Sequence, residues 1–129
     1  MLGRAPEELS IRSPESEVEP YLLKAKVAMD SDKLTAPAQD NAYFYYQEVI
    51  KLVPDHEVAR QGLTEIANRY ADLAEQALDR FEYVNAKHYV RKGIRVQPEN
   101  SRLAALQQRT YVIKDVPTRL FKGIKSIFE

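Results

Sequence analysis

The chain of 129 residues contains no cysteine, so it has no disulfide framework, no thiol nucleophile and no thiolate zinc site. It also lacks an excess of either charge, because lysine plus arginine and aspartate plus glutamate each number 19. A balanced charge gives no overall field to attract nucleic acid or an acidic surface. What it does have is a hydrophobic content of 44%, which is enough for one domain with its own core.

Long apolar runs are also missing. The N-terminus has no apolar signal region, and no window reaches the roughly 18 apolar residues that cross a bilayer. We therefore expect a soluble chain located in the cytoplasm. A periplasmic or membrane-tethered parent protein is the alternative if this chain is a piece of a longer one.

Motifs that carry catalysis or cofactor binding are absent as well. There is no GxxxxGK[ST] or GxGxxG phosphate loop, no GxSxG, and no basic run interleaved with aromatic residues. His56 and His88 each lack a second metal ligand at helical spacing. The carboxylate clusters have no apolar pocket to shift a pKa, so we interpret them as solvated faces. We expect no enzyme activity, no metal or other cofactor, and no nucleic-acid partner.

Apolar residues recur every three or four positions through most of the chain, which predicts helices and no strand. Residues 1–17 lack this period and are interpreted as a flexible segment. Helices are expected from Glu19, with Pro20 in the first turn, and from Ala42 to Pro54, capped by Asp40 or Asn41. A long helix follows over about residues 55–81, then a tight turn over 82–86, a helix to Pro98, and another from about residue 99. Gly62 inside the long helix is tolerable if another helix approaches closely there.

The chain matches itself at a shift of 44 residues, as from Pro54 to Pro98. The identical pairs are Asn41 and Asn85, Ala42 and Ala86, Tyr45 and Tyr89, Ile50 and Ile94, and Pro54 and Pro98. Self-similarity at such a period is typical of stacked helical units that each leave an apolar face for a neighbour to cover.

The spacing of these residues resembles the tetratricopeptide repeat family. The second unit keeps the family's pattern at Tyr70, Leu73, Ala74, Ala77, Ala86, Val90 and Pro98. The first unit is a variant whose turn is lengthened by "TAPAQ". The resemblance covers about residues 19–110, and it implies an all-α fold of antiparallel helix-turn-helix repeats over residues 18–110. Residues 111–129 are expected to form a C-terminal basic amphipathic helix that caps the repeats.

In this family the first helix of each unit lines a groove that receives a peptide or a partner's helix. The resemblance therefore implies a scaffold or adaptor that binds a protein partner. The implied groove residues are Lys26, Asp30, Asn68, Asp72, Glu75 and Asp79. This lining is net acidic, so we expect a basic or amphipathic helix as the partner.

Four consecutive aromatic residues, Tyr43 to Tyr46, begin the helix after Asn41. A helical wheel places Tyr45 and Tyr46 on the apolar side and Tyr43 at its edge, which predicts that they pack in the core. Phe44 points away from that side, with His88 at the matching place in the second unit. We expect Phe44 to contact a later helix or a partner.

The C-terminal segment from residue 114 alternates basic and apolar residues as an amphipathic helix does. Its apolar positions include Leu120, Phe121, Ile124, Ile127 and Phe128. Three interpretations stay open: the segment caps the last repeat, it docks on another protein or a second copy of the chain, or it lies on an anionic membrane surface. The chain is accordingly expected to be a monomer or a homodimer.

Overall fold

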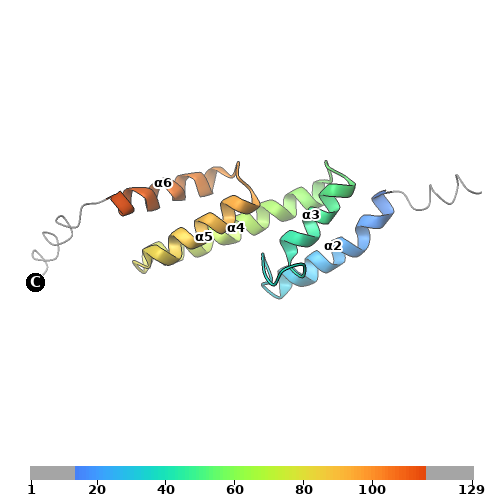
Figure 1. The fold of residues 1–129 in the computed structure, drawn as a ribbon, viewed down its shortest axis with the longest axis horizontal. Coiled ribbons are helices and arrows are strands. Elements are labelled where there is room, and N and C mark those ends of the chain that lie inside the picture. The colour runs from blue at the N-terminus through green and yellow to red at the C-terminus, as the bar shows by residue number, and fades with distance from the viewer. Residues whose placement is uncertain (1–13, 116–129) are drawn as a thin grey trace, which may run out of the picture. The chain divides into compact units, whose positions relative to one another are not determined.

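The computed structural model describes residues 14–115, with side chains to residue 110, and this part of the chain is all-α (Figure 1). It forms the helices α2 (Pro14–Asp30), α3 (Ala42–Leu52), α4 (Glu57–Asp79), α5 (Tyr83–Val96) and α6 (Ser101–Asp115), and its residues form no strand. The prediction of an all-helical fold is confirmed. Within these residues no helix combines the length and the apolar character that crossing a membrane would require.

α2 begins at Pro14, so the prediction of a helix start at Glu19 is wrong. Residue 14 is the first described residue and is already helical. Glu15 and Glu17 lie in the first turn of the described helix, where acidic side chains are favourable. As a result Pro20 lies inside the helix instead of in its first turn.

The N-terminus of α3 has a hydrogen-bond partner for each N–H group of its first turn. The N–H groups of Ala42 and Tyr43 donate to the carbonyls of Lys33 and Leu34, at 2.8 and 2.9 Å. The Phe44 N–H donates to the side-chain oxygen of Asn41 at 2.7 Å. Asn41 is therefore the cap, and the α2–α3 connection is tied to the helix that it precedes.

α2 and α4 end in the same way, with a Schellman motif. After α2, Lys33 N–H donates to Ala28 O at 2.8 Å, and Asp32 has a φ of 58°. After α4, Glu82 N–H donates to Ala77 O at 2.8 Å, and Phe81 has a φ of 61°. α5 can therefore begin at Tyr83, and the predicted turn over residues 82–86 is wrong beyond its first residue.

The chain divides into two compact units that meet inside α4, between Ile66 and Ala67. In the first unit α2 packs beside α3, and in the second α5 packs beside α6 (Figure 1). The core of the first unit includes Val18, Ala25, Ala28, Met29, Leu34, Ala42, Tyr46, Val49, Ala59 and Ile66. The core of the second includes Ala67, Tyr70, Ala71, Ala74, Ala77, Leu78, Ala86, Val90, Val96, Leu103 and Leu106.

Hydrogen bonds around the end of α3 recur around the end of α5, at a shift of 44 residues. Val53 N–H donates to Val49 O at 2.8 Å, and Gln97 N–H donates to Gly93 O at 2.9 Å. The helix that follows each is capped by the equivalent residue. His56 Nδ1 accepts from Ala59 N–H at 3.3 Å. Asn100 Oδ1 accepts from Leu103 N–H at 3.0 Å.

Burial recurs at the same shift. Pairs that are buried at both positions include Ala42 and Ala86, Tyr46 and Val90, Val49 and Gly93, Ala59 and Leu103, and Gly62 and Leu106. In each unit a glycine at one of these positions lies against a large side chain at another, but the glycine stands at a different position in the two units. A Cβ at Gly62 would overlap the ring of Tyr46, and a Cβ at Gly93 would overlap the end of Leu103. The expected close approach of another helix at Gly62 is confirmed, and α3 supplies it.

The predicted boundary between residues 110 and 111 falls inside α6. The C-terminal residues proposed for membrane contact or self-association, Leu120, Phe121, Ile124, Ile127 and Phe128, lie outside the described residues.

Candidate functional site

The predicted acidic face of α4 is occupied by an arginine from α6. Arg102 binds Glu75 with two hydrogen bonds, Nε to Oε1 at 3.2 Å and Nη2 to Oε2 at 2.9 Å. The same Nη2 lies 2.5 Å from Asp72 Oδ1, and Nη1 donates to the carbonyl of Asn68 at 3.5 Å. These hydrogen bonds, to Glu75 first and then to Asp72, raise the pKa of Arg102 above its ordinary value. The planar guanidinium thus joins three of the predicted site residues.

Arg102 changes the charge that this face offers to a partner. Its positive charge offsets one of the two carboxylates that it binds, and neither carboxylate is left without a cation. Because all three side chains are partly exposed, each ion pair contributes at most about 1 kcal/mol to stability. The cluster links α4 to α6 within the second unit. A basic partner would have to compete with Arg102 for these carboxylates.

The other predicted groove residues do not join this cluster. Asp79 is exposed at the end of α4. Lys26 and Asp30 are exposed on α2, in the first unit. Asn68 makes a second link to the α5–α6 connection, because its Oδ1 accepts from Asn100 Nδ2 at 3.2 Å.

The aromatic row at the start of α3 divides differently from the prediction. Tyr46 is buried as expected, while Tyr43 and Tyr45 are only half-buried. Phe44 is half-buried too. Its ring meets that of Tyr45 edge-on, with centroids 5.4 Å apart, which shields part of its surface. His88, at the matching position, is exposed as expected.

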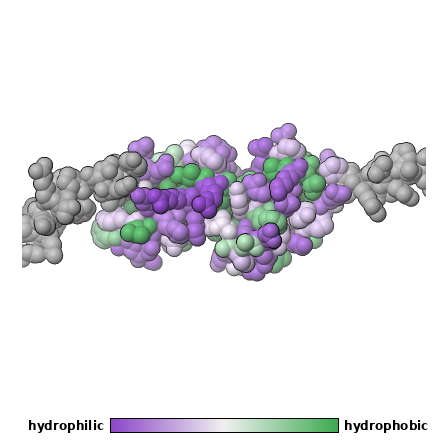
Figure 2. All heavy atoms as spheres, viewed as in Figure 1, coloured by the Kyte–Doolittle hydropathy of each residue, from purple (hydrophilic) through white to green (hydrophobic). Residues whose placement is uncertain are grey.

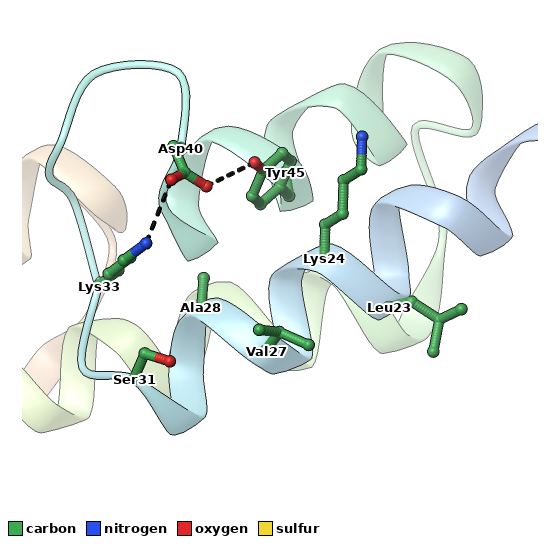
Figure 3. A pocket seen from close by; sticks show the side chains of 8 residues that line it. All are labelled: Leu23, Lys24, Val27, Ala28, Ser31, Lys33, Asp40 and Tyr45. Carbon is green, nitrogen blue, oxygen red and sulfur yellow. Dashed lines mark hydrogen bonds and ion pairs between the residues drawn. The ribbon is translucent and has the colours of Figure 1, made fainter.

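A surface cavity of about 210 Å³ lies in the first unit, between α2 and the start of α3 (Figure 3). Leu23, Val27 and Ala28 of α2 line it on one side together with Ser31, which directly follows the helix, and Lys24 of α2 lines it as well. The opposite wall is formed by Lys33, Asp40 and Tyr45. No prediction from the sequence named this cavity, because the α2–α3 connection that builds its far wall has no helical period.

The far wall is held by a chain of polar contacts (Figure 3). Tyr45 OH donates to Asp40 Oδ1 at 2.7 Å, and Lys33 Nζ lies 3.2 Å from Asp40 Oδ2. The hydrogen bond from Tyr45, followed by that from Lys33, lowers the pKa of Asp40 below its usual 3.8. The same bond raises the pKa of Tyr45 above 10.0. Both oxygens of Asp40 therefore have a donor, which fixes the Tyr45 ring over the cavity.

The α2 side of the cavity carries apolar side chains that the fold leaves exposed. Leu23 and Val27 are each 64% exposed, one helical turn apart. Figure 2 shows hydrophobic residues, in green, at the surface among hydrophilic ones. The sequence could not show that Leu23 and Val27 are exposed, because exposure depends on which elements cover α2.

Residues 14–110 contain no group of three or more histidine or acidic side chains that could hold a metal ion. Comparisons with protein-family models, with curated proteins and with solved structures found no match for this chain.

Proposed function

We propose that this chain is a protein-binding scaffold or adaptor built from tetratricopeptide-like helical repeats. The observation that carries the binding role is the cavity in the first unit, with Leu23 and Val27 exposed beside it. Exposed neighbouring apolar side chains on a charged helix are typical of a surface that meets a partner. The repeat assignment is supported by the capping bonds and buried positions that recur at a shift of 44 residues.

The proposal is a binding role without catalysis. The carboxyl group at the cavity, Asp40, has a pKa that is lowered by Tyr45 and Lys33. A general acid that works near neutral pH needs a raised carboxyl pKa, so this shift has the opposite direction. The cavity is better suited to hold a side chain than to transfer a proton.

Site-specific photocrosslinking tests the proposed function. A photoreactive amino acid at Leu23 should crosslink the full chain to a protein in a lysate of its source cells, and Val27→Glu should abolish that product. The same amino acid at Gln61, an exposed position of α4, is the control and should give no product. Equal crosslinking at Leu23 and Gln61, or none at Leu23, would refute the binding role. A product of twice the chain's mass would show self-association instead.

A further inference from the structure

The cavity of Figure 3 is the right size for one large side chain. Its volume of about 210 Å³ compares with the roughly 150 Å³ that accommodate a benzene ring in an engineered protein cavity. An entire helix does not fit in such a space, so a partner would insert a single anchor. The apolar contacts available to that anchor come from Leu23, Val27 and Ala28 on α2 and from the ring of Tyr45.

The walls of the cavity are held in place before any partner arrives. Ala28 is buried in the α2 core, and Tyr45 is fixed through Asp40 to Lys33. Backbone hydrogen bonds from Ala42 and Tyr43 hold Lys33 and Leu34 against the start of α3. A cavity with fixed walls loses little conformational entropy on binding.

The charges that line the cavity are two lysines and one carboxylate. Asp40 forms an ion pair with Lys33 and also attracts Lys24, which makes no ion pair of its own among residues 14–110, so the lining keeps a net positive charge. The ammonium group of Lys24 lies 5.9 Å from the centre of the Tyr45 ring, and both residues line the cavity. A carboxylate on the partner, next to the inserted side chain, would complete this pairing.

We propose that the cavity binds an acidic amphipathic segment of a partner protein, with one aromatic or branched aliphatic side chain inserted and a neighbouring carboxylate on Lys24. The inference rests on the proposed function and adds the chemistry of the partner. It differs from the basic partner that the α4 carboxylates predict, because Arg102 already binds two of those carboxylates.

The test uses three synthetic helical peptides and the full chain labelled with nitrogen-15. The acidic probe has one phenylalanine flanked by glutamates, the second replaces the phenylalanine by alanine, and the third replaces the glutamates by lysines. The acidic probe should shift the amide resonances of Leu23, Lys24, Val27 and Tyr45 in a saturable way. The alanine probe should bind at least tenfold more weakly, since it loses the burial of an aromatic side chain. The lysine probe should bind more weakly because it meets Lys24 with like charge.

Lys24→Glu is the decisive variant. It should lower the affinity for the acidic probe by about twofold to fivefold, which is the range for an exposed ion pair, and it should raise the affinity for the lysine probe. Lys26→Glu is the matched control, because Lys26 is exposed on the same helix but does not line the cavity. The control should change the affinity of both probes much less than Lys24→Glu does.

Equal binding of the acidic and lysine probes would overturn this inference while leaving the proposed function standing. The absence of shifts at the cavity while Leu23 still crosslinks to a protein would do the same. Loss of the crosslink with intact probe binding would refute the proposed function instead. Equal effects of Lys24→Glu and Lys26→Glu would also overturn the inference, because the charge effect would then be general.

Discussion

Tyr46 and Gly62 fit each other because the absence of a side chain at one makes room for the ring of the other. Gly62 in a helix interior costs up to about 1 kcal/mol relative to alanine, so its presence in α4 needs such a reason. The 7% exposure of Tyr46 shows that its ring has little free space into which it could move. At residue 62, helix propensity therefore favours alanine, whereas packing against Tyr46 favours glycine.

We predict that the packing effect at residue 62 is larger than the propensity effect. Gly62→Ala should lower the free energy of unfolding by about 1–3 kcal/mol, the usual cost of overpacking, although alanine is the better helix former. Urea denaturation measures this change. Combining it with Tyr46→Leu, which removes the obstructing ring, should cost less than the sum of the two single variants. An increase in stability for Gly62→Ala alone would show that the ring is not in contact with α4.

The lowered pKa of Asp40 predicts how stability changes at acid pH. Its pKa is lowered in the folded chain, so its contribution to stability is present above the usual 3.8 and is lost as pH falls through the folded value. Carbon-13 NMR titration of the Asp40 carboxyl should give a pKa below 3.8. Tyr45→Phe should bring it back toward 3.8, because the tyrosine hydrogen bond is the largest single cause of the lowered pKa. An unchanged pKa of Asp40 in Tyr45→Phe would show that this hydrogen bond does not form.

Pro20, like Gly62, is a residue with low helix propensity in the interior of a helix. Proline at an interior position removes one backbone hydrogen bond and costs about 3 kcal/mol or more in a complete helix. Its side chain is exposed, and only one and a half to two turns of α2 precede it. The penalty therefore falls on the first part of α2, including the buried Val18.

We predict that Pro20→Ala raises the free energy of unfolding by about 1–3 kcal/mol. Pro14→Ala is the matched control and should change stability less, since residue 14 lies at the end of the described helix and Pro20 lies in its interior. Thermal unfolding followed by circular dichroism distinguishes the two. Equal effects of both variants would mean that residues 14–19 do not add to the stability of α2.

Phe81, two residues after the end of α4, has a backbone conformation that favours glycine or asparagine. Its φ is 61°, and its side chain is 75% exposed, so little burial offsets the strained backbone. We predict that Phe81→Asn stabilises the chain by about 0.5–1.5 kcal/mol, with loss of the edge-on ring contact to Tyr83 as the opposing term. Differential scanning calorimetry should show a higher Tm. A lower Tm would show that the contact with Tyr83 outweighs the strain.

Local signals in the sequence predicted the helices well where caps and prolines mark their ends. Asn41 and Pro54 bound α3, and Pro98 follows α5, as the sequence analysis expected. The start of α5 was missed because Phe81, not glycine, adopts the left-handed turn conformation that normally signals a helix end. The start of α2 was missed because the proline at residue 20 was assigned to a first turn.

The candidate site was less predictable because it depends on contacts between residues far apart in the chain. A helical wheel placed Asp72 and Glu75 on one face of α4, yet it could not show that Arg102 of α6 binds both. The cavity has the same cause. Its wall needs Asp40 and Lys33 in an irregular connection, whose geometry follows from backbone bonds to the start of α3.

At the scale of the whole molecule, several positions buried in the first unit match positions buried in the second at a shift of 44 residues, with different side chains. Val49 and Ala59 in the first unit match Gly93 and Leu103 in the second, and all four are buried. Gly93 and Leu103 approach each other closely, because a Cβ on the glycine would overlap the leucine. If the units are true repeats, Val49 and Ala59 share one space in the same way, with the larger side chain on the other helix.

Exchanging the two sizes tests whether the units are repeats. Val49→Gly and Ala59→Leu should each destabilise the chain, the first by a cavity and a helix penalty, the second by overpacking, at about 1–4 kcal/mol each. In the double variant the leucine fills the space left by the valine, so the combined loss should be smaller than the sum by about 1–3 kcal/mol. Ala59→Leu combined with Val90→Ala, in the second unit, should be additive. Urea denaturation of the full set measures the coupling, and additive losses in the Val49 and Ala59 pair would show that the shift of 44 residues relates sequences without relating structures.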